Sequence, residues 1–342
     1  MNRPPRLASR RWRALVAVAA LLSTLACSHT AHGPHKPASA ELRSVAERVA
    51  AEGVVELPLL VHQGYPFVAG EVNGRRGHFM VDNGTPFRFF FNANFAPVTM
   101  GRELGRGQAG SGQPIVVHEA RGVQTLRLGP DAARELEPAQ AATGEGLRAA
   151  DFSFIETGVQ PDFLGFVGAP WLSPFAFLLR YAPARWLLSD AGAGAQRLLE
   201  GSERVALIRF EGRDGSLPYA TLQVDGVNLR ARFDTGTPGV LQLTAQFRAR
   251  LERAGVLRCT ESNEPARSTR CELEGLRYGA TALELAPLLT NTGSDNRITL
   301  GAALLSRYVT VWNLSQATID LRRDTSRCLI SEKPQPAHSA SQ

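Results

Sequence analysis

One short segment of the first half of the chain returns, without a gap, in the second half. Residues 82–86 read DNGTP and residues 234–238 read DTGTP, an offset of 152 residues from position 82 to position 234. The same offset relates residues 72–74, VNG, to residues 224–226, VDG. Two copies are too few for a solenoid, so the repeat predicts one unit that is duplicated and arranged as a pseudo-twofold pair.

The residues around each copy have the pattern of β-strands. Short apolar runs at 54–61, 66–72, 78–81 and 87–91 are separated by Gly, Asn and Pro. Asn73-Gly74 and Asp225-Gly226 are typical of hairpin turns, since these residue types tolerate positive φ. Each half also closes with a hairpin-like pair of runs, at 177–181 with 185–188 and at 309–312 with 318–321.

We therefore expect a mostly β, bilobal protein with two duplicated β lobes. The first lobe is expected over residues 54–198 and the second over residues 203–330, with a Gly- and Ala-rich boundary between them. Two helices are predicted: residues 41–52 form an amphipathic pattern, and residues 244–254 begin with an N-cap threonine and end before Gly255.

Paired aspartates are the chemistry that this repeat favours. In each copy an apolar strand delivers an aspartate, a glycine lets the loop backbone approach a partner closely, and a threonine places a hydroxyl beside the carboxylate. The predicted catalytic residues are Asp82 and Asp234, and the residues predicted to support them are Asn83, Gly84, Thr85, Thr235, Gly236 and Thr237. The alternative is that the two aspartates are unconnected turn residues.

On these motifs the sequence resembles the aspartic peptidases, both the bilobal pepsin-like type and the retropepsin-like lobes of bacteria. The resemblance runs from about residue 54 to residue 321 and includes Leu164-Gly165 and Leu300-Gly301, which by the resemblance lie under the two aspartate loops. It implies an acid-protease-like fold and an endopeptidase in which Asp82 and Asp234 activate a water molecule. The resemblance does not say which aspartate is the ionised member.

Two features depart from that pattern. Asn83 stands where a Thr or Ser is usual, and its longer, planar amide is expected to change how the lobes sit. The second departure is at residues 101–118, the candidate flap, which have no tyrosine but are rich in glycine, including Gly107, Gly110 and Gly112. These glycines suit a mobile lid or an inert loop. A catalytically inactive relative that binds peptides, or a structural lipoprotein of the envelope, is the alternative function.

The N-terminus has the pattern of an export signal. The predicted signal covers residues 1–26. Its first part contains five arginines, which are followed by an apolar run that is too short to span a bilayer, and it ends with small and apolar residues directly before Cys27. We expect Cys27 to be lipidated on the periplasmic face of a bacterial membrane, the alternative being ordinary cleavage into the periplasm or medium. Residues 27–53 are predicted to be a linker with the short helix, and residues 331–342 a disordered tail.

Charge and cysteines limit the partners. The chain has 38 basic and 32 acidic residues, and five of the basic ones lie in the predicted signal. The charges of the remaining residues are nearly balanced and therefore do not indicate nucleic-acid binding. No metal and no cofactor are expected. The expected partners are a peptide or protein substrate and a membrane, which the protein contacts only through its lipid. The protein is expected to be a monomer. Cys259 with Cys271 is the favoured disulfide, and the pairings with Cys328 stay open.

Overall fold

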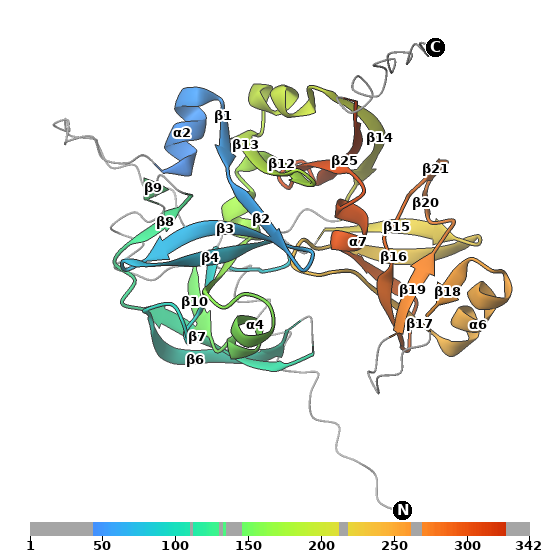
Figure 1. The fold of residues 1–342 in the computed structure, drawn as a ribbon, viewed down its shortest axis with the longest axis horizontal. Coiled ribbons are helices and arrows are strands. Elements are labelled where there is room, and N and C mark those ends of the chain that lie inside the picture. The colour runs from blue at the N-terminus through green and yellow to red at the C-terminus, as the bar shows by residue number, and fades with distance from the viewer. Residues whose placement is uncertain are drawn as a thin grey trace, which may run out of the picture. The chain divides into compact units, whose positions relative to one another are not determined.

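The computed structural model describes residues 44–109, 112–129, 133–134, 146–211, 218–260 and 269–325. In these residues the chain folds into strands in three sheets, with a few short helices (Figure 1). The predicted mostly β class is confirmed. The predicted signal, the linker up to residue 43, Cys27 and the tail at 331–342 lie outside the described residues.

The first sheet is built from the first half of the chain. It has ten strands, and β2 pairs with β3 at its side. Its order is β6 (Thr99–Gln108), β7 (Pro114–Arg121), β10 (Leu147–Ala150), β5 (Phe89–Asn92), β11 (Phe163–Gly168), β4 (Arg75–Asp82), β3 (Tyr65–Val72), β8 (Leu126–Leu128) and β9 (Ala133–Arg134), with β2 (Leu59–His62) off this path. The pairs β10 with β5 and β11 with β4 are parallel, and the neighbouring strands β11 and β5 are antiparallel.

The second sheet is built from the second half and has nine strands. Its order is β18 (Leu257–Cys259), β19 (Thr269–Leu273), β22 (Leu288–Thr292), β17 (Val240–Leu243), β23 (Arg297–Leu300), β16 (Val227–Phe233), β15 (Tyr219–Val224), β20 (Arg277–Tyr278) and β21 (Thr281–Ala282). Here β17 with β22 and β16 with β23 are the parallel pairs, and β17 with β23 is antiparallel.

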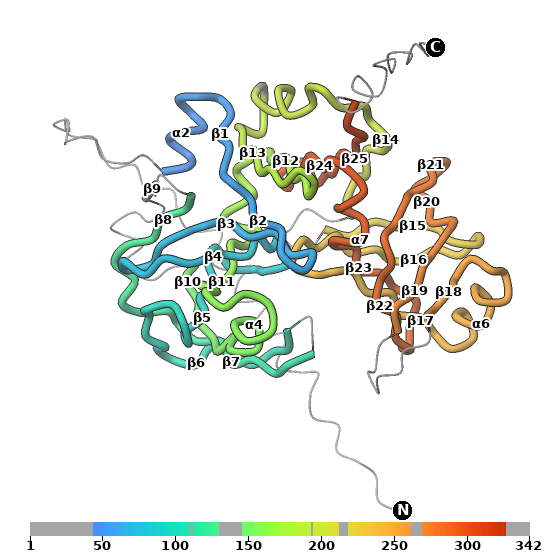
Figure 2. The backbone as a smooth tube through the Cα atoms, viewed as in Figure 1, coloured from blue at the N-terminus to red at the C-terminus, as the bar shows by residue number. Residues whose placement is uncertain are grey.

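A third sheet takes strands from both halves. Its order is β1 (Val54–Leu57), β13 (Ala184–Asp190), β12 (Phe175–Tyr181), β24 (Val309–Asn313), β25 (Thr318–Asp324) and β14 (Ser202–Arg209). The two hairpin-like pairs predicted to close each half are the hairpins β12–β13 and β24–β25 of this sheet. They join where β12 lies beside β24 (Figure 2). These two strands run antiparallel, with Leu178 opposite Val311.

The helices are short and few. They are α2 (Val45–Glu52), α4 (Ser153–Gly158), α5 (Ala169–Leu172), the 3₁₀ helix η2 (Ala193–Leu199), α6 (Ala245–Arg253) and α7 (Ala302–Leu305). Helix α2 begins later than residue 41 because Ser44 and Glu47 form a capping box there. Helix α6 begins after Thr244, whose hydroxyl accepts from the backbone N–H of Phe247. No helix of the described residues is both long and apolar enough to cross a membrane.

Aromatic residues form hydrophobic clusters on both faces of the first sheet. On β5, Phe89 and Phe91 point into the main core, and Phe90 between them packs into a second cluster with Phe152 and Phe166. Ring centroids in this second cluster lie 4.8 Å apart for Phe90 and Phe152, and 5.0 Å apart for Phe152 and Phe166, in edge-to-face geometry. Such pairs stabilise a core beyond their buried area.

The two predicted hairpin turns have the backbone that their residues favour. Asn73 and Gly74 have φ of 47° and 83°, and Asp225 and Gly226 have φ of 49° and 72°. Positive φ at both central positions matches the twist of the flanking strands. These turns set the register of β3 with β4 and of β15 with β16, the strands that lead to the two aspartates.

Candidate functional site

Two inner strands carry the predicted aspartates to their positions. Asp82 is the last residue of β4 and lies opposite Gly168 on β11. Asp234 follows β16 directly, and its backbone N–H donates to the carbonyl of Leu300 at the end of β23 (2.9 Å). Each aspartate thus stands at the end of a strand that has neighbours on both sides, so its backbone is fixed by the sheet.

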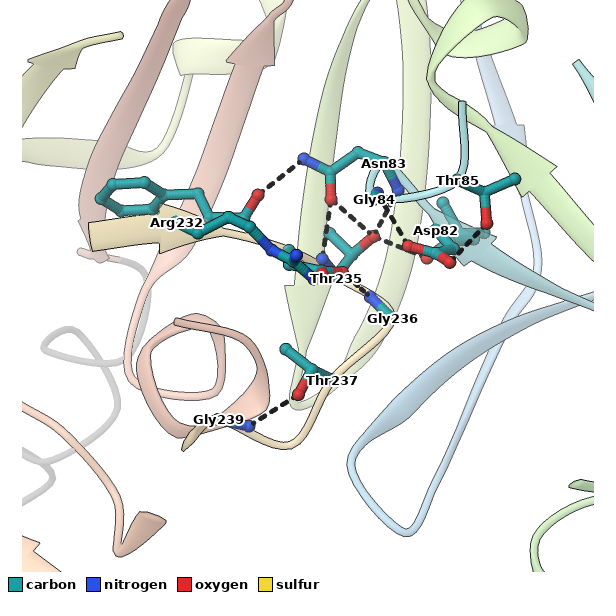
Figure 3. A network of polar contacts seen from close by, with 12 residues as sticks. Asp82, Asn83, Gly84, Thr85, Arg232, Thr235, Gly236, Thr237 and Gly239 are labelled. Atoms are coloured by element: carbon teal, nitrogen blue, oxygen red, sulfur yellow. Dashed lines mark hydrogen bonds and ion pairs between the residues drawn. The ribbon is translucent and has the colours of Figure 1, made fainter. Parts of the chain in front are cut away.

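Within the first loop, the carboxyl group of Asp82 accepts two hydrogen bonds. The backbone N–H of Gly84 donates to Oδ1 at 2.7 Å, and the hydroxyl of Thr85 donates to Oδ2, also at 2.7 Å (Figure 3). Both contacts orient the carboxyl group toward the second loop. In that loop the backbone N–H of Gly236 donates to Asp234 Oδ1 at 2.9 Å, the counterpart of the Gly84 contact.

Asn83 and Thr235 connect the two loops by reciprocal hydrogen bonds. The amide Oδ1 of Asn83 accepts from the backbone N–H of Thr235 (2.7 Å), and its Nδ2 donates to the carbonyl of Phe233 (3.1 Å). In return, Thr235 Oγ1 accepts from the backbone N–H of Asn83 (3.1 Å) and donates to the carbonyl of Val81 (2.6 Å). The carboxamide therefore makes the same two kinds of contact as the hydroxyl, and both side chains are fully buried.

The two glycines allow the loops to approach each other. A Cβ at Gly84 would lie 2.7 Å from both carboxyl oxygens of Asp234, and one at Gly236 would lie 2.4 Å from Cγ of Asp82. Real Cβ atoms do not approach other heavy atoms so closely, so each carboxyl group occupies the space left by the absent side chain of the opposite glycine. The structure thus brings Asp82, Asp234 and the predicted supporting residues of both loops together.

The two carboxyl groups are buried and interact directly. Asp82 is 9% exposed and Asp234 is 4% exposed. Burial, followed by the negative charge of Asp234, raises the pKa of Asp82 to about 7, against the lowering effect of the Thr85 hydroxyl. A side-chain hydrogen bond with Asp234 also raises this pKa. A carboxyl group with such a pKa keeps its proton through the acidic range.

Arg232 is part of the site, and the sequence reasoning missed it. Its Nη2 forms an ion pair with Oδ2 of Asp234, and its side chain is 30% exposed. The sequence did contain a signal: Arg232 lies two residues before Asp234 on a strand, and alternate strand residues face the same side.

Two tyrosines also lie near Asp234 and were not predicted. Burial, together with the charge of Asp234, raises the pKa of Tyr65 on β3 and that of Tyr181 on β12. Tyr181 is buried, and its hydroxyl has no hydrogen-bond partner among the described residues. The sequence offers no signal for Tyr181, because β12 belongs to a different sheet from either aspartate.

Thr237 differs from its counterpart Thr85. Its hydroxyl accepts from the backbone N–H of Gly239 at 3.4 Å, and the hydrogen bonds to the carboxyl group of Asp234 come instead from Arg232 and Gly236. The predicted flap is a hairpin of β6 and β7, with Gly107 on β6 opposite Ile115 and Gly112 in the connecting turn with φ of 93°. Gly110 lies outside the described residues.

The glycine beneath the first aspartate loop is Gly168, so the prediction of Gly165, three residues earlier, is wrong. The backbone N–H of Ala169 donates to the carbonyl of Thr85, as that of Ala302 donates to the carbonyl of Thr237 (both 3.0 Å). A Cβ at Gly168 would lie 2.6 Å from that Thr85 carbonyl oxygen. Two steps from an apolar residue to a glycine follow each other on β11, Leu164-Gly165 and Val167-Gly168, and the sequence alone does not select between them.

The structure joins Cys259 and Cys271 in a disulfide between the paired strands β18 and β19. Cys27 and Cys328 lie outside the described residues. No cluster of His, Cys, Asp and Glu side chains with the arrangement of a metal site occurs in the part of the chain that the structure describes.

Comparison with known proteins does not assign the chain to a family. No family model and no curated protein matches it. Among solved structures it is similar to basic 7S globulin from soybean, with 13% identity and a TM-score of 0.48 over 81% of this chain and 96% of that one. The expected membership of the aspartic peptidase family is therefore wrong: it rested on motifs of a few residues, which fix local loops and leave most of the chain unconstrained.

Proposed function

We propose that this protein is an endopeptidase that hydrolyses peptide bonds with a water molecule activated between Asp82 and Asp234. The observation that carries the proposal is the direct interaction of two buried carboxyl groups from loops that share the pattern Asp-Xaa-Gly-Thr-Pro, one of them with a pKa of about 7. Two carboxyl groups in contact do not both ionise readily, so the pair holds one proton over a wide pH range. That state suits hydrolysis.

The chemistry follows from the single shared proton. The ionised carboxylate takes a proton from water, whose oxygen attacks the carbonyl carbon of the peptide bond. The protonated carboxyl group donates to the carbonyl oxygen and stabilises the negative charge that develops there. The loop-to-loop hydrogen bonds of Asn83 and Thr235 hold the two carboxyl groups at a fixed separation, which removes the entropic cost of assembling them.

We further propose that the first two sheets are two copies of one lobe. Three observations support this. The strand orders correspond position by position, the parallel and antiparallel pairs fall at the same places, and both aspartates stand at the end of the same strand of their sheet, β4 and β16. The reciprocal contacts of Asn83 and Thr235 support a pseudo-twofold relation between the two lobes.

The experiment compares wild-type protein with Asp82→Asn and Asp234→Asn variants. Purified protein without residues 1–26 is incubated with a reduced and alkylated, unfolded polypeptide between pH 3 and 8, and new termini are detected by mass spectrometry. Either substitution is expected to lower the rate by a factor of about 10²–10⁴, the usual contribution of a general acid or base. The control is Asp295→Asn, since Asp295 is exposed and contacts Gln242 and Arg297. Equal cleavage by all variants would contradict the proposal.

A second candidate function is the binding of an extended peptide without turnover, or a structural role in the envelope. Arg232 favours it, because a guanidinium on Asp234 neutralises part of the charge that a general base needs. A binding protein would retain affinity for peptide in Asp82→Asn and Asp234→Asn and show no turnover in any form. Isothermal titration of the three proteins with the same polypeptide separates this function from catalysis.

We also propose that the protein is exported, carries lipid on Cys27 and acts as a monomer. The basic and apolar N-terminal residues and the small residues before Cys27 support this. Mass analysis of the mature N-terminus tests the anchor: a diacylglyceryl-modified Cys27 is expected, and an unmodified terminus at another residue would contradict it.

A further inference from the structure

The two carboxyl groups of the site differ in what binds their Oδ2 atoms. Asp82 Oδ2 accepts from the hydroxyl of Thr85, a neutral donor. Thr237 holds the matching position in the second loop, but its hydroxyl accepts from Gly239, and Asp234 Oδ2 instead contacts the guanidinium of Arg232. One carboxyl group therefore contacts a hydroxyl, as Figure 3 shows for Asp82 and Thr85, and the other contacts a permanent cation.

Only the second sheet has an arginine at the position of Arg232. The offset of 152 residues that relates Asn83 to Thr235 also relates Met80 to Arg232. Met80 is 2% exposed and packs among the phenylalanines of the first sheet. The neighbours differ in the same sense: Met80 lies opposite Phe67 and Phe166, and Arg232 lies opposite Tyr219 and Thr299. The surroundings of Asp82 are thus apolar where those of Asp234 are polar and positively charged.

Four titratable groups from other elements interact with Asp234 or Arg232. They are Asp82 from the loop after β4, Tyr65 from β3, Tyr181 from β12 and Tyr219 from β15. Each of these is neutral or negative at any pH, whereas the guanidinium of Arg232 is positive and contacts Asp234 directly. Its attraction to Asp234 raises the pKa of Arg232 against the effect of burial, which lowers it, and the guanidinium stays charged.

We propose that Arg232 makes the pair inequivalent, so that Asp234 is the ionised carboxylate that takes the proton from water and Asp82 is the carboxyl group that keeps its proton. Arg232 is a positioning residue, since it acts through Asp234. This inference rests on the proposed function. It is consistent with the burial that raises the pKa of Asp82 to about 7.

The proton transfers then balance as follows. The water oxygen bonds to the carbonyl carbon as Asp234 takes one water proton, and the proton of Asp82 passes to the carbonyl oxygen, which gives a gem-diol. The carbon–nitrogen bond breaks as Asp234 returns its proton to the amine, and one gem-diol hydroxyl returns a proton to Asp82. The products are a carboxylic acid and an amine, and both side chains regain their initial states.

The test measures protonation directly. Carboxyl ¹³C resonances of aspartate in the full mature chain are followed from pH 3 to 9, and the two site signals are identified by their loss in Asp82→Asn and Asp234→Asn. We expect the signal that titrates near neutral pH to be the one lost in Asp82→Asn. If the signal lost in Asp234→Asn is the one that titrates near neutral pH, the assignment is overturned.

Arg232→Met, which introduces the residue found in the first sheet, tests the cause. A cation in contact favours the ionised form of a carboxyl group by about 1–3 pH units. Both titration steps, and both limbs of the kcat/KM profile, should therefore move to higher pH by about one unit or more, and kcat/KM at pH 5 should fall about tenfold. Arg232→Lys should restore most of the shift. The control is Arg230→Met, an exposed arginine on the same strand whose guanidinium lies over the ring of Tyr219.

The outcomes separate the two proposals. No cleavage by wild-type protein, with the expected titrations, would refute the proposed function and leave the role of Arg232 supported. Unchanged titrations in Arg232→Met would overturn that role, as would a rise in kcat/KM at every pH, which would show that Arg232 blocks the site. Thermal denaturation confirms folding, and the wild-type titration alone decides the assignment if the Met variant does not fold.

Discussion

Asn83 and Thr235 each accept a backbone N–H from the other across 152 residues of chain, at 2.7 Å for the amide oxygen and 3.1 Å for the hydroxyl. The planar amide of Asn83 spans both the N–H of Thr235 and the carbonyl of Phe233. An oxygen acceptor and an N–H donor on one carboxamide replace the acceptor and donor of a single hydroxyl.

Replacement of Asn83 by Ala should therefore destabilise the protein. It leaves the N–H of Thr235 and the carbonyl of Phe233 buried and unpaired, at a cost of about 2–4 kcal/mol in the free energy of unfolding. Urea denaturation measures this cost. Asn94→Ala is the control, since Asn94 is exposed, and Asn83→Thr should recover more than half of the loss. A loss below about 0.5 kcal/mol in Asn83→Ala would show that the bridge contributes little.

Gly84→Ala and Gly236→Ala should each lower activity about 100-fold or more, because a misplacement of about 1 Å has this effect. The added Cβ would meet the opposite carboxyl group at 2.7 Å and 2.4 Å and push the pair apart. Gly158→Ala is the control, since nothing lies within 4 Å of its Cβ. Activity within a factor of two of wild type in both variants would show that the loops are not in contact.

Turnover should fall as pH rises above about 7, because the proton on Asp82 is lost there. The same shift acts on stability. The pKa of Asp82 is higher in the folded than in the unfolded chain, so the native state binds this proton more tightly, and its contribution is lost as pH rises toward 7. Asp82→Asn should therefore raise the free energy of unfolding at pH 8 relative to wild type, by about 2 kcal/mol. The gain should be absent at pH 4, and an equal difference at both values would contradict the shift.

Tyr181→Phe should leave the free energy of unfolding unchanged or raise it by up to about 1 kcal/mol. The hydroxyl that it removes is buried and has no partner among the described residues, so its desolvation is uncompensated. Thermal denaturation at pH 7 gives the comparison. Tyr308→Phe is the contrasting variant, because the Tyr308 hydroxyl accepts from the N–H of Glu284 at 2.7 Å, and it should lose about 1 kcal/mol.

The sequence predicted local features well where a few residues dictate the backbone. The turns at Asn73-Gly74 and Asp225-Gly226 and the N-cap at Thr244 are of this kind. Position along a strand was predicted less well, because β11 offers two successive apolar-glycine steps and only pairing with β4 selects Gly168.

Contacts between distant strands could not be predicted from the sequence. Tyr181 approaches Asp234 from another sheet, and no spacing rule relates the two residues. Arg232 could have been found from its two-residue spacing to Asp234. The prediction of family membership was wrong for a related reason, because two short loops do not determine the arrangement of the remaining strands.

The pairing of β12 with β24 has a consequence for any attempt to divide this chain. These are neighbouring strands of the six-stranded sheet, one from each half, and Leu178 and Val311 face each other across the junction. A fragment that ended before β24 would leave the whole hydrogen-bonding edge of β12 open, and open edges recruit other strands. We expect such a half to form dimers or aggregates through β12. The two halves of this chain should therefore not be soluble when each is produced without the other.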